Sequence, residues 1–135
     1  MKKKTLLKKS KATKSEKKKS FEIKFYESII RERPDFIGAL IPLADAYTKA
    51  DFYREGLVVD KKLSALKPAD PVVHYNLACS LSLTGKPKEA LGALKKAVLL
   101  GYSDFKYILG DSDLVSLREL PEFGTFFSKL KKLKV

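Results

Sequence analysis

Residues 74–81 of this 135-residue chain read HYNLACSL, and this stretch decides the fold because its pattern occurs twice. A shift of 34 residues places it, without a gap, on residues 40–47, which read LIPLADAY. In both copies a leucine in the middle is followed directly by an alanine. The prolines Pro34 and Pro68 also stand one period apart. A repeat of this length is typical of helical hairpins that stack on one another.

The match continues into the residues that follow each copy. Gly56 falls on Ala90, and Leu57 falls on Leu91. A small residue next to a large one recurs where two helices of a hairpin must cross closely. Both copies are therefore predicted to contain a second helix that packs on the first.

Cap and turn residues divide the chain into helices. Asp70 is expected to cap a helix that begins at Pro71, because the fixed backbone angle of proline suits a first helical turn. No segment shows the period-2 alternation of a strand, so we predict an all-α fold. The expected helices span about residues 19–33, 35–50, 52–66, 71–83 and 87–100, followed by shorter ones between 103 and 134.

These residues resemble the tetratricopeptide repeat (TPR). The second copy matches the family pattern at residues 74–81 and at Gly85, Ala90, Leu94 and Ala97. The first copy offers Leu40, Leu43, Ala44, Tyr47, Gly56, Leu63 and Pro68 at the positions of the pattern. The departures from the pattern are Asp51 for the turn glycine, Asp60 for an aromatic residue, Gly56 for an alanine, His74 for a large aromatic residue, and Tyr102 for a closing proline.

The resemblance implies an α-α superhelix of tetratricopeptide-like helical hairpins, with repeats at about 37–70 and 71–104. Capping helices at 20–33 and 103–134 then cover the two ends of a domain that spans residues 20–135. The lysine-rich tail, residues 1–19, lies outside this domain. We expect the tail to be disordered in isolation, because it has almost nothing to bury.

The net charge of +12 is concentrated at the two ends of the chain. Residues 1–20 hold ten lysines against Glu16, residues 129–135 add four lysines, and residues 21–128 are almost neutral. This distribution argues against a basic groove on the domain and confines electrostatic contacts with nucleic acid or an anionic surface to the tails. The charged start resembles that of a signal peptide, but no apolar stretch follows it, so we do not expect one.

Cys79 and His74 are the only cysteine and the only histidine. They exclude a disulfide within the chain and the usual zinc ligand sets, and we expect no metal and no cofactor. A reducing cytoplasm is the expected location. His74 occupies a packing position of the repeat, so we expect a structural role. The sequence Asp111-Ser112-Asp113 lacks the glycine and the distal glutamate of a calcium loop and is expected to cap a helix.

In the architecture that the resemblance implies, the first helix of each hairpin lines a concave face. The candidate partner-binding residues on this face are Ile41, Asp45, Thr48, Lys49, Val72, Tyr75, Cys79 and Ser82. Substituting Tyr75 by alanine is expected to weaken binding without unfolding the domain. The alternative is that Ile41 and Tyr75 pack against the N-terminal helix and fill the groove. Some relatives bind a C-terminal carboxylate here, but the cations that this requires are missing around Asn76.

These features predict a protein without enzyme activity: a protein–protein interaction scaffold that binds a peptide or partner helix in its groove. The alternative is a nucleic-acid- or ribosome-associated accessory protein that uses its basic N-terminal tail. The last helix has an apolar stripe, which we expect to seal the end of the helical array; binding to a membrane surface is the alternative. The stripe consists of Phe123, Phe126, Phe127, Leu130 and Leu133.

Overall fold

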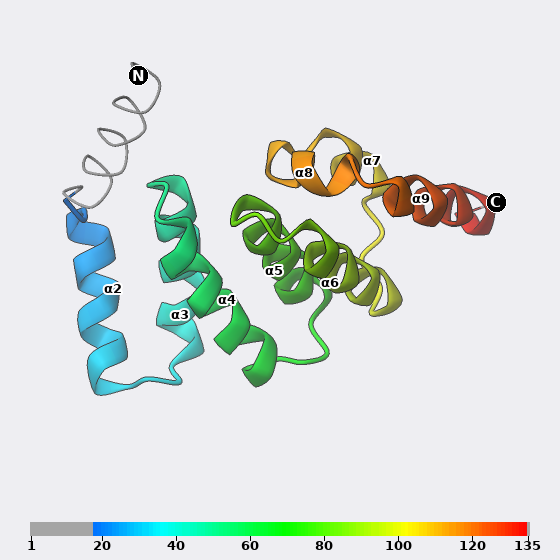
Figure 1. The fold of residues 1–135 in the computed structure, drawn as a ribbon. Helices are drawn as coiled ribbons and strands as arrows, with labels where there is room; N and C mark the ends of the chain where they lie inside the picture. The colour runs from blue at the N-terminus through cyan, green and yellow to red at the C-terminus, as the bar shows by residue number, and fades with distance from the viewer. Residues whose placement is uncertain (1–17, 135) are drawn as a thin grey trace, which may run out of the picture.

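A computed structural model describes residues 18–134, and every regular element in this range is a helix (Figure 1). The all-α class predicted from the sequence is therefore confirmed. The elements are α2 (Phe21–Glu32), α3 (Ile37–Lys49), α4 (Tyr53–Leu66), α5 (Pro71–Leu83), α6 (Pro87–Leu99), α7 (Phe105–Gly110), the 3-10 helix η1 (Ser112–Leu114), α8 (Val115–Arg118) and α9 (Pro121–Lys134). The prediction for the tail falls almost wholly on residues 1–17, which lie outside the described residues.

The ends of the helices follow from local side chains. The carboxylate of Asp70 accepts hydrogen bonds from the backbone N–H groups of Val72, at 2.9 Å, and Val73, at 3.3 Å, so it caps α5 as predicted. The two hairpins turn at equivalent positions: Asp51 has φ +66° and Gly85 has φ +78°. Asp51 thus adopts the left-handed conformation that glycine adopts one period later.

From α2 to α6, each helix packs on the next one along the chain, so this part of the fold is a row of helices (Figure 1). One apolar cluster joins α2, α3 and α4 and includes Val73 of α5. A second cluster joins α5, α6 and the segments from α7 to α9, and it includes Leu57 of α4. Gly56 is at a close crossing, since a Cβ placed there would lie 3.2 Å from Oγ1 of Thr48. Ala90, one period later, is fully buried. The small residues of the repeat therefore lie at helix crossings, as predicted.

The C-terminal segments cover the end of the row near α6. Phe123, Phe127 and Leu130 of α9 are buried in the second cluster, which confirms that this part of the stripe seals the end. Leu133 is exposed and does not contribute. Within the described range, no helix is long and apolar enough to cross a bilayer.

Candidate functional site

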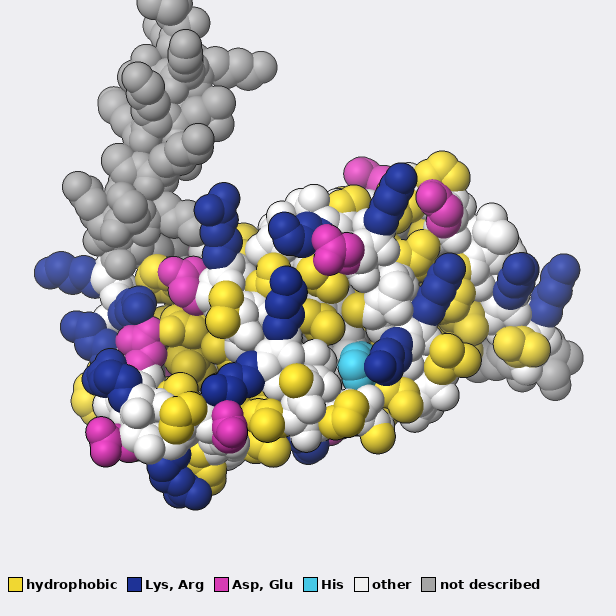
Figure 2. Space-filling view, turned by 60° about the horizontal axis from the view of Figure 1, so that its bottom comes forward, with side chains coloured by type: hydrophobic (Ala, Val, Ile, Leu, Met, Phe, Trp, Pro, Cys, Tyr) yellow, Lys and Arg dark blue, Asp and Glu magenta, His cyan; other side chains and the backbone are white. Residues whose placement is uncertain are grey.

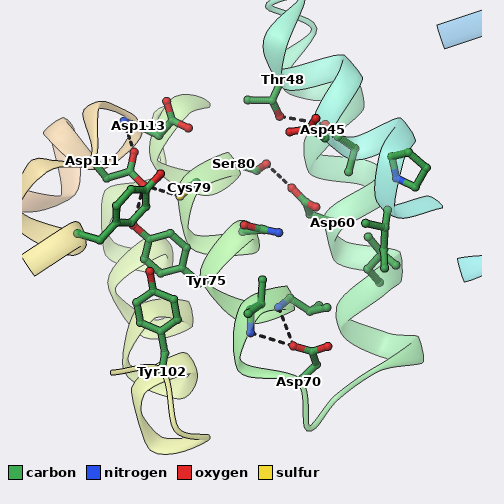
Figure 3. Close-up of a pocket in the computed structure, with 18 residues that line it drawn as sticks. Asp45, Thr48, Asp60, Asp70, Tyr75, Cys79, Ser80, Tyr102, Asp111 and Asp113 are labelled. Carbon is green, nitrogen blue, oxygen red and sulfur yellow. Dashed lines mark hydrogen bonds between the residues drawn. The ribbon is translucent and has the colours of Figure 1, made fainter. Parts of the chain in front are cut away.

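A groove of about 620 Å³ lies between α3 and α5 (Figure 3). Helix α4 contributes Asp60 and Leu63 to it, and the segment after α6 contributes the wall on the other side. The side chains from that segment are Tyr102, Tyr107, Asp111 and Asp113. The groove is therefore built from both repeats and from the C-terminal segment that packs beside them.

Of the eight candidate residues, six line this groove: Ile41, Asp45, Thr48, Val72, Tyr75 and Cys79. Lys49 and Ser82 do not. Ser82 is buried beneath α8, where its hydroxyl lies 2.9 Å from that of Ser116. Lys49 extends into solvent and pairs with Asp45 at 2.9 Å. The placement of Ser82 in the groove was wrong because nothing in the repeat pattern indicates that α8 covers this turn of α5.

Tyr75 is a packed residue, with only 4% of its surface exposed. Its ring stacks on Tyr102, with centroids 4.3 Å apart and planes 8° apart, and its hydroxyl donates a 2.6 Å hydrogen bond to Asp111. This packing leads us to expect that Tyr75→Ala destabilises the domain, because the substitution would remove a stacked ring and a buried donor. The alternative packing against the N-terminal helix is wrong, since no described residue of α2 lines the groove and Ile41 is 45% exposed.

Asp111 organises the wall formed by the C-terminal segment (Figure 3). One carboxylate oxygen accepts from the hydroxyl of Tyr75 and lies 3.7 Å from the sulfur of Cys79. The other accepts from the backbone N–H of Asp113 at 3.0 Å, so Asp111 caps η1 as predicted. Arg118 donates to the backbone carbonyl of Asp111 at 2.6 Å. The wall is thus held by hydrogen bonds that connect α5, η1 and α8.

Cys79, Asp111 and Asp113 present ligand atoms within 4.8 Å of one another. Burial, followed by the charge of Asp111, raises the pKa of the Cys79 thiol, so the sulfur keeps its proton. Asp111 already accepts hydrogen bonds from Tyr75 and from the backbone of Asp113. These bonds hold the fold together, and nothing in the geometry requires a metal ion among them.

Asp60 lines the groove, although in the sequence it stands out only as a departure from the repeat pattern. It is 4% exposed, and its carboxylate accepts a hydrogen bond from Ser80 of α5. Burial raises the pKa of Asp60 to about 6, and the Ser80 hydrogen bond offsets part of this rise. One period later stands Leu94, which is fully buried. The exchange of an apolar residue for a carboxylate was the signal that could have revealed this site.

The groove is acidic, although the chain is basic. No lysine or arginine is among its lining residues, whereas five aspartates are: Asp45, Asp60, Asp70, Asp111 and Asp113. Burial, together with the charge of Asp111, raises the pKa of Asp113. In the view of Figure 2, lysines and arginines are spread over the surface rather than gathered into one patch. The prediction that the domain has no basic groove holds for this site.

His74 is a structural residue, as predicted. It is buried, and its Nε2–H donates a 2.8 Å hydrogen bond to the backbone carbonyl of Pro68. This bond ties α5 to the turn that precedes it. His74 does not line the groove, so it is not available there as a general base.

In a comparison with known proteins, one protein matches part of this chain. Over 80 residues the chain is 35% identical to a chloroplastic protein of Arabidopsis thaliana. The match covers 57% of this chain and 24% of that protein, so the chain spans about a quarter of its relative's length. No family model matches the sequence. No solved structure matches it either.

Proposed function

We propose that this chain is a tetratricopeptide-type binding module without enzyme activity, whose groove holds a peptide or helix of another protein. The 34-residue period supports the tetratricopeptide assignment, as do the equivalent left-handed turns at Asp51 and Gly85 and the small residues at the helix crossings. In this proposal α3 and α4 form one hairpin, α5 and α6 form the next, and the two hairpins stack through the contact of α4 with α5.

The observation that favours binding is the exposed apolar surface inside the groove. Ile41 on α3 and Val72 on α5 are 45% and 53% exposed, and both line the cavity. Concave sites with an apolar lining and a few placed polar groups are typical of ligand and peptide binding. Asn76, also exposed in the groove, can hydrogen-bond to the backbone of an extended peptide.

Site-specific photo-crosslinking tests this proposal. A photoreactive phenylalanine analogue is placed at Ile41 or Val72 in the full chain and, as matched controls, at Val58 or Leu99. These two residues are exposed apolar positions outside the groove. After irradiation in extract of the source cells, we expect the same protein adduct from both groove positions and not from the controls. Equal adducts from all four positions, or adducts from none, would refute the proposal.

The nucleic-acid alternative rests on the lysine-rich tail, residues 1–19, of which residues 1–17 lie outside the described residues. Replacing Lys2, Lys3, Lys4, Lys8 and Lys9 by glutamine in the full chain tests it by RNA filter binding at two salt concentrations. Strong, salt-sensitive binding that disappears in the variant would favour the alternative function. We also propose a reducing compartment, the cytoplasm, because the only thiol is free; cell fractionation tests this location.

A further inference from the structure

The aspartates of the groove lie on both of its walls. Figure 3 shows Asp111 and Asp113 on one side and Asp45 and Asp60 on the other. Within the described residues, no hydrogen bond or ion pair to the carboxylate of Asp113 is found. In the part of the chain that the structure describes, the exposed Lys49 is the one ion-pair partner of Asp45. Because carboxylates lie on both walls and no lysine or arginine lines the groove, the part of the groove between these aspartates has an excess of negative charge.

Carboxylates that are partly removed from water gain most from a cationic ligand. Burial raises the pKa of both Asp60 and Asp113, because the charged form loses hydration in the groove. A cation placed between the walls would replace that lost hydration. Electrostatic complementarity of this kind selects a partner by its charge and speeds association.

Apolar surface lies beside these acids. Ile41 precedes Asp45 by one helical turn on α3, and Val72 lies across the groove on α5. A metal ion or a small cation would leave this apolar surface exposed to water. A peptide that presents a basic side chain next to an apolar one would cover both, and a cavity of about 620 Å³ is large enough for several side chains.

We propose that the groove binds a cationic segment of a partner protein, with a lysine or arginine between Asp45 and Asp113 and an adjacent apolar side chain on Ile41 and Val72. This inference rests on the proposed function and specifies its partner. The chain's own N-terminal segment has a similar charge, but it joins the described fold at the start of α2. Helix α3 lies between α2 and the groove, and Lys19 is already paired with Glu27 at 2.7 Å.

Fluorescence anisotropy with two labelled peptides tests the proposal on the full chain. The probes are an eight-residue peptide that alternates lysine and leucine and the same peptide with glutamate in place of lysine. We expect the lysine peptide alone to bind and its affinity to fall as salt is added. The variant Asp45→Asn/Asp113→Asn should weaken its binding about three- to ten-fold, as expected for two partly exposed charge pairs.

The matched control is Glu89→Gln/Glu119→Gln, which makes the same change in net charge at two exposed positions outside the groove. We expect it to change the affinity by less than about two-fold. Equal losses in both double variants would overturn the proposal, because the attraction would then be a property of the whole surface. Failure of the lysine peptide to bind would overturn it as well.

The source of the cationic segment is tested in the glutamine-substituted tail variant described above. If the cationic segment belongs to another protein, we expect the tail variant and the unsubstituted chain to bind the lysine peptide with affinities within about two-fold of each other. The reason is that a peptide bound at the groove does not contact the tail. A large gain in affinity would mean that the chain's own N-terminus occupies the groove, and would overturn the assignment to a partner protein. If crosslinking yields adducts while the lysine peptide does not bind, the charge assignment is wrong and the binding function stands.

Discussion

Replacing Asp60 by asparagine is expected to stabilise the protein above pH 6 and to change its stability little near pH 4. Burial raises the pKa of Asp60 from 3.8 to about 6 in the folded protein. Protonated Asp60 therefore favours folding: this contribution is fully present below pH 3.8 and is lost as the pH rises through about 6. The rise in pKa corresponds to about 3 kcal/mol at pH 8.

Asparagine imitates the protonated side chain and keeps an oxygen that can accept from Ser80. Urea unfolding followed by far-UV circular dichroism at pH 4, 6 and 8 measures the free energy of unfolding of both proteins. The difference should grow from well under 1 kcal/mol at pH 4 to about 3 kcal/mol at pH 8. The comparison at each pH cancels the titration of other groups, which both proteins share.

Asp35→Asn is the matched control, because Asp35 is an exposed aspartate paired with Lys62 at 3.0 Å. We expect the control to change the free energy of unfolding by less than about 1 kcal/mol. Our account of Asp60 would be refuted if Asp60→Asn failed to stabilise the protein at pH 8. It would also be refuted if the gain were the same at pH 4 as at pH 8, since the effect would then not come from ionisation.

Four further substitutions or probes test the packing. Gly85→Ala should lower the free energy of unfolding by about 1 kcal/mol, because φ is +78° at this residue. Gly92→Ala should raise the free energy of unfolding by up to about 1 kcal/mol, because Gly92 lies in helix α6 with open space around its Cα. Urea unfolding measures both changes. Tyr75→Phe should lower it by about 1–3 kcal/mol, since Asp111 loses a buried donor; a loss below about 0.5 kcal/mol would contradict this assignment. The thiol of Cys79 should react with a disulfide reagent at pH 8 only as fast as the protein unfolds, because burial raises its pKa; rapid labelling of the native protein would show that it is accessible.

The helices and their ends could be predicted because they depend on local chemistry. Asp70 and Pro71 fix the start of α5 through a side-chain cap and a backbone angle, both of which are visible in a short stretch of sequence. Asp51 could be placed at a turn because Gly85 stands one period later. Periodicity and caps together predicted the bounds of α2 to α6 within about two residues, whereas the shorter helices after residue 103 were predicted without bounds.

The groove could be predicted only in part, because one of its walls depends on contacts between distant segments. The location of Ile41 and Val72 in the groove could be predicted, because each lies on the first helix of a hairpin. Tyr75 was misjudged because its partners Tyr102 and Asp111 come from a segment with no counterpart in the repeat. Nothing in the periodicity indicates where such a segment packs, so its side of the groove could not be derived from the sequence.

The electrostatic character of the groove shows why net charge is a poor guide to the partner. The chain has a net charge of +12, which by itself favours an acidic partner. Equivalent positions of the repeat differ in charge between the copies: Asp45 stands where the second copy has Cys79, and Asp60 stands where it has Leu94. Aspartates introduced at such positions gather in one cavity although they are dispersed along the chain. Our proposal therefore assigns the choice of peptide to the local field in that cavity rather than to the sum of charges over the surface.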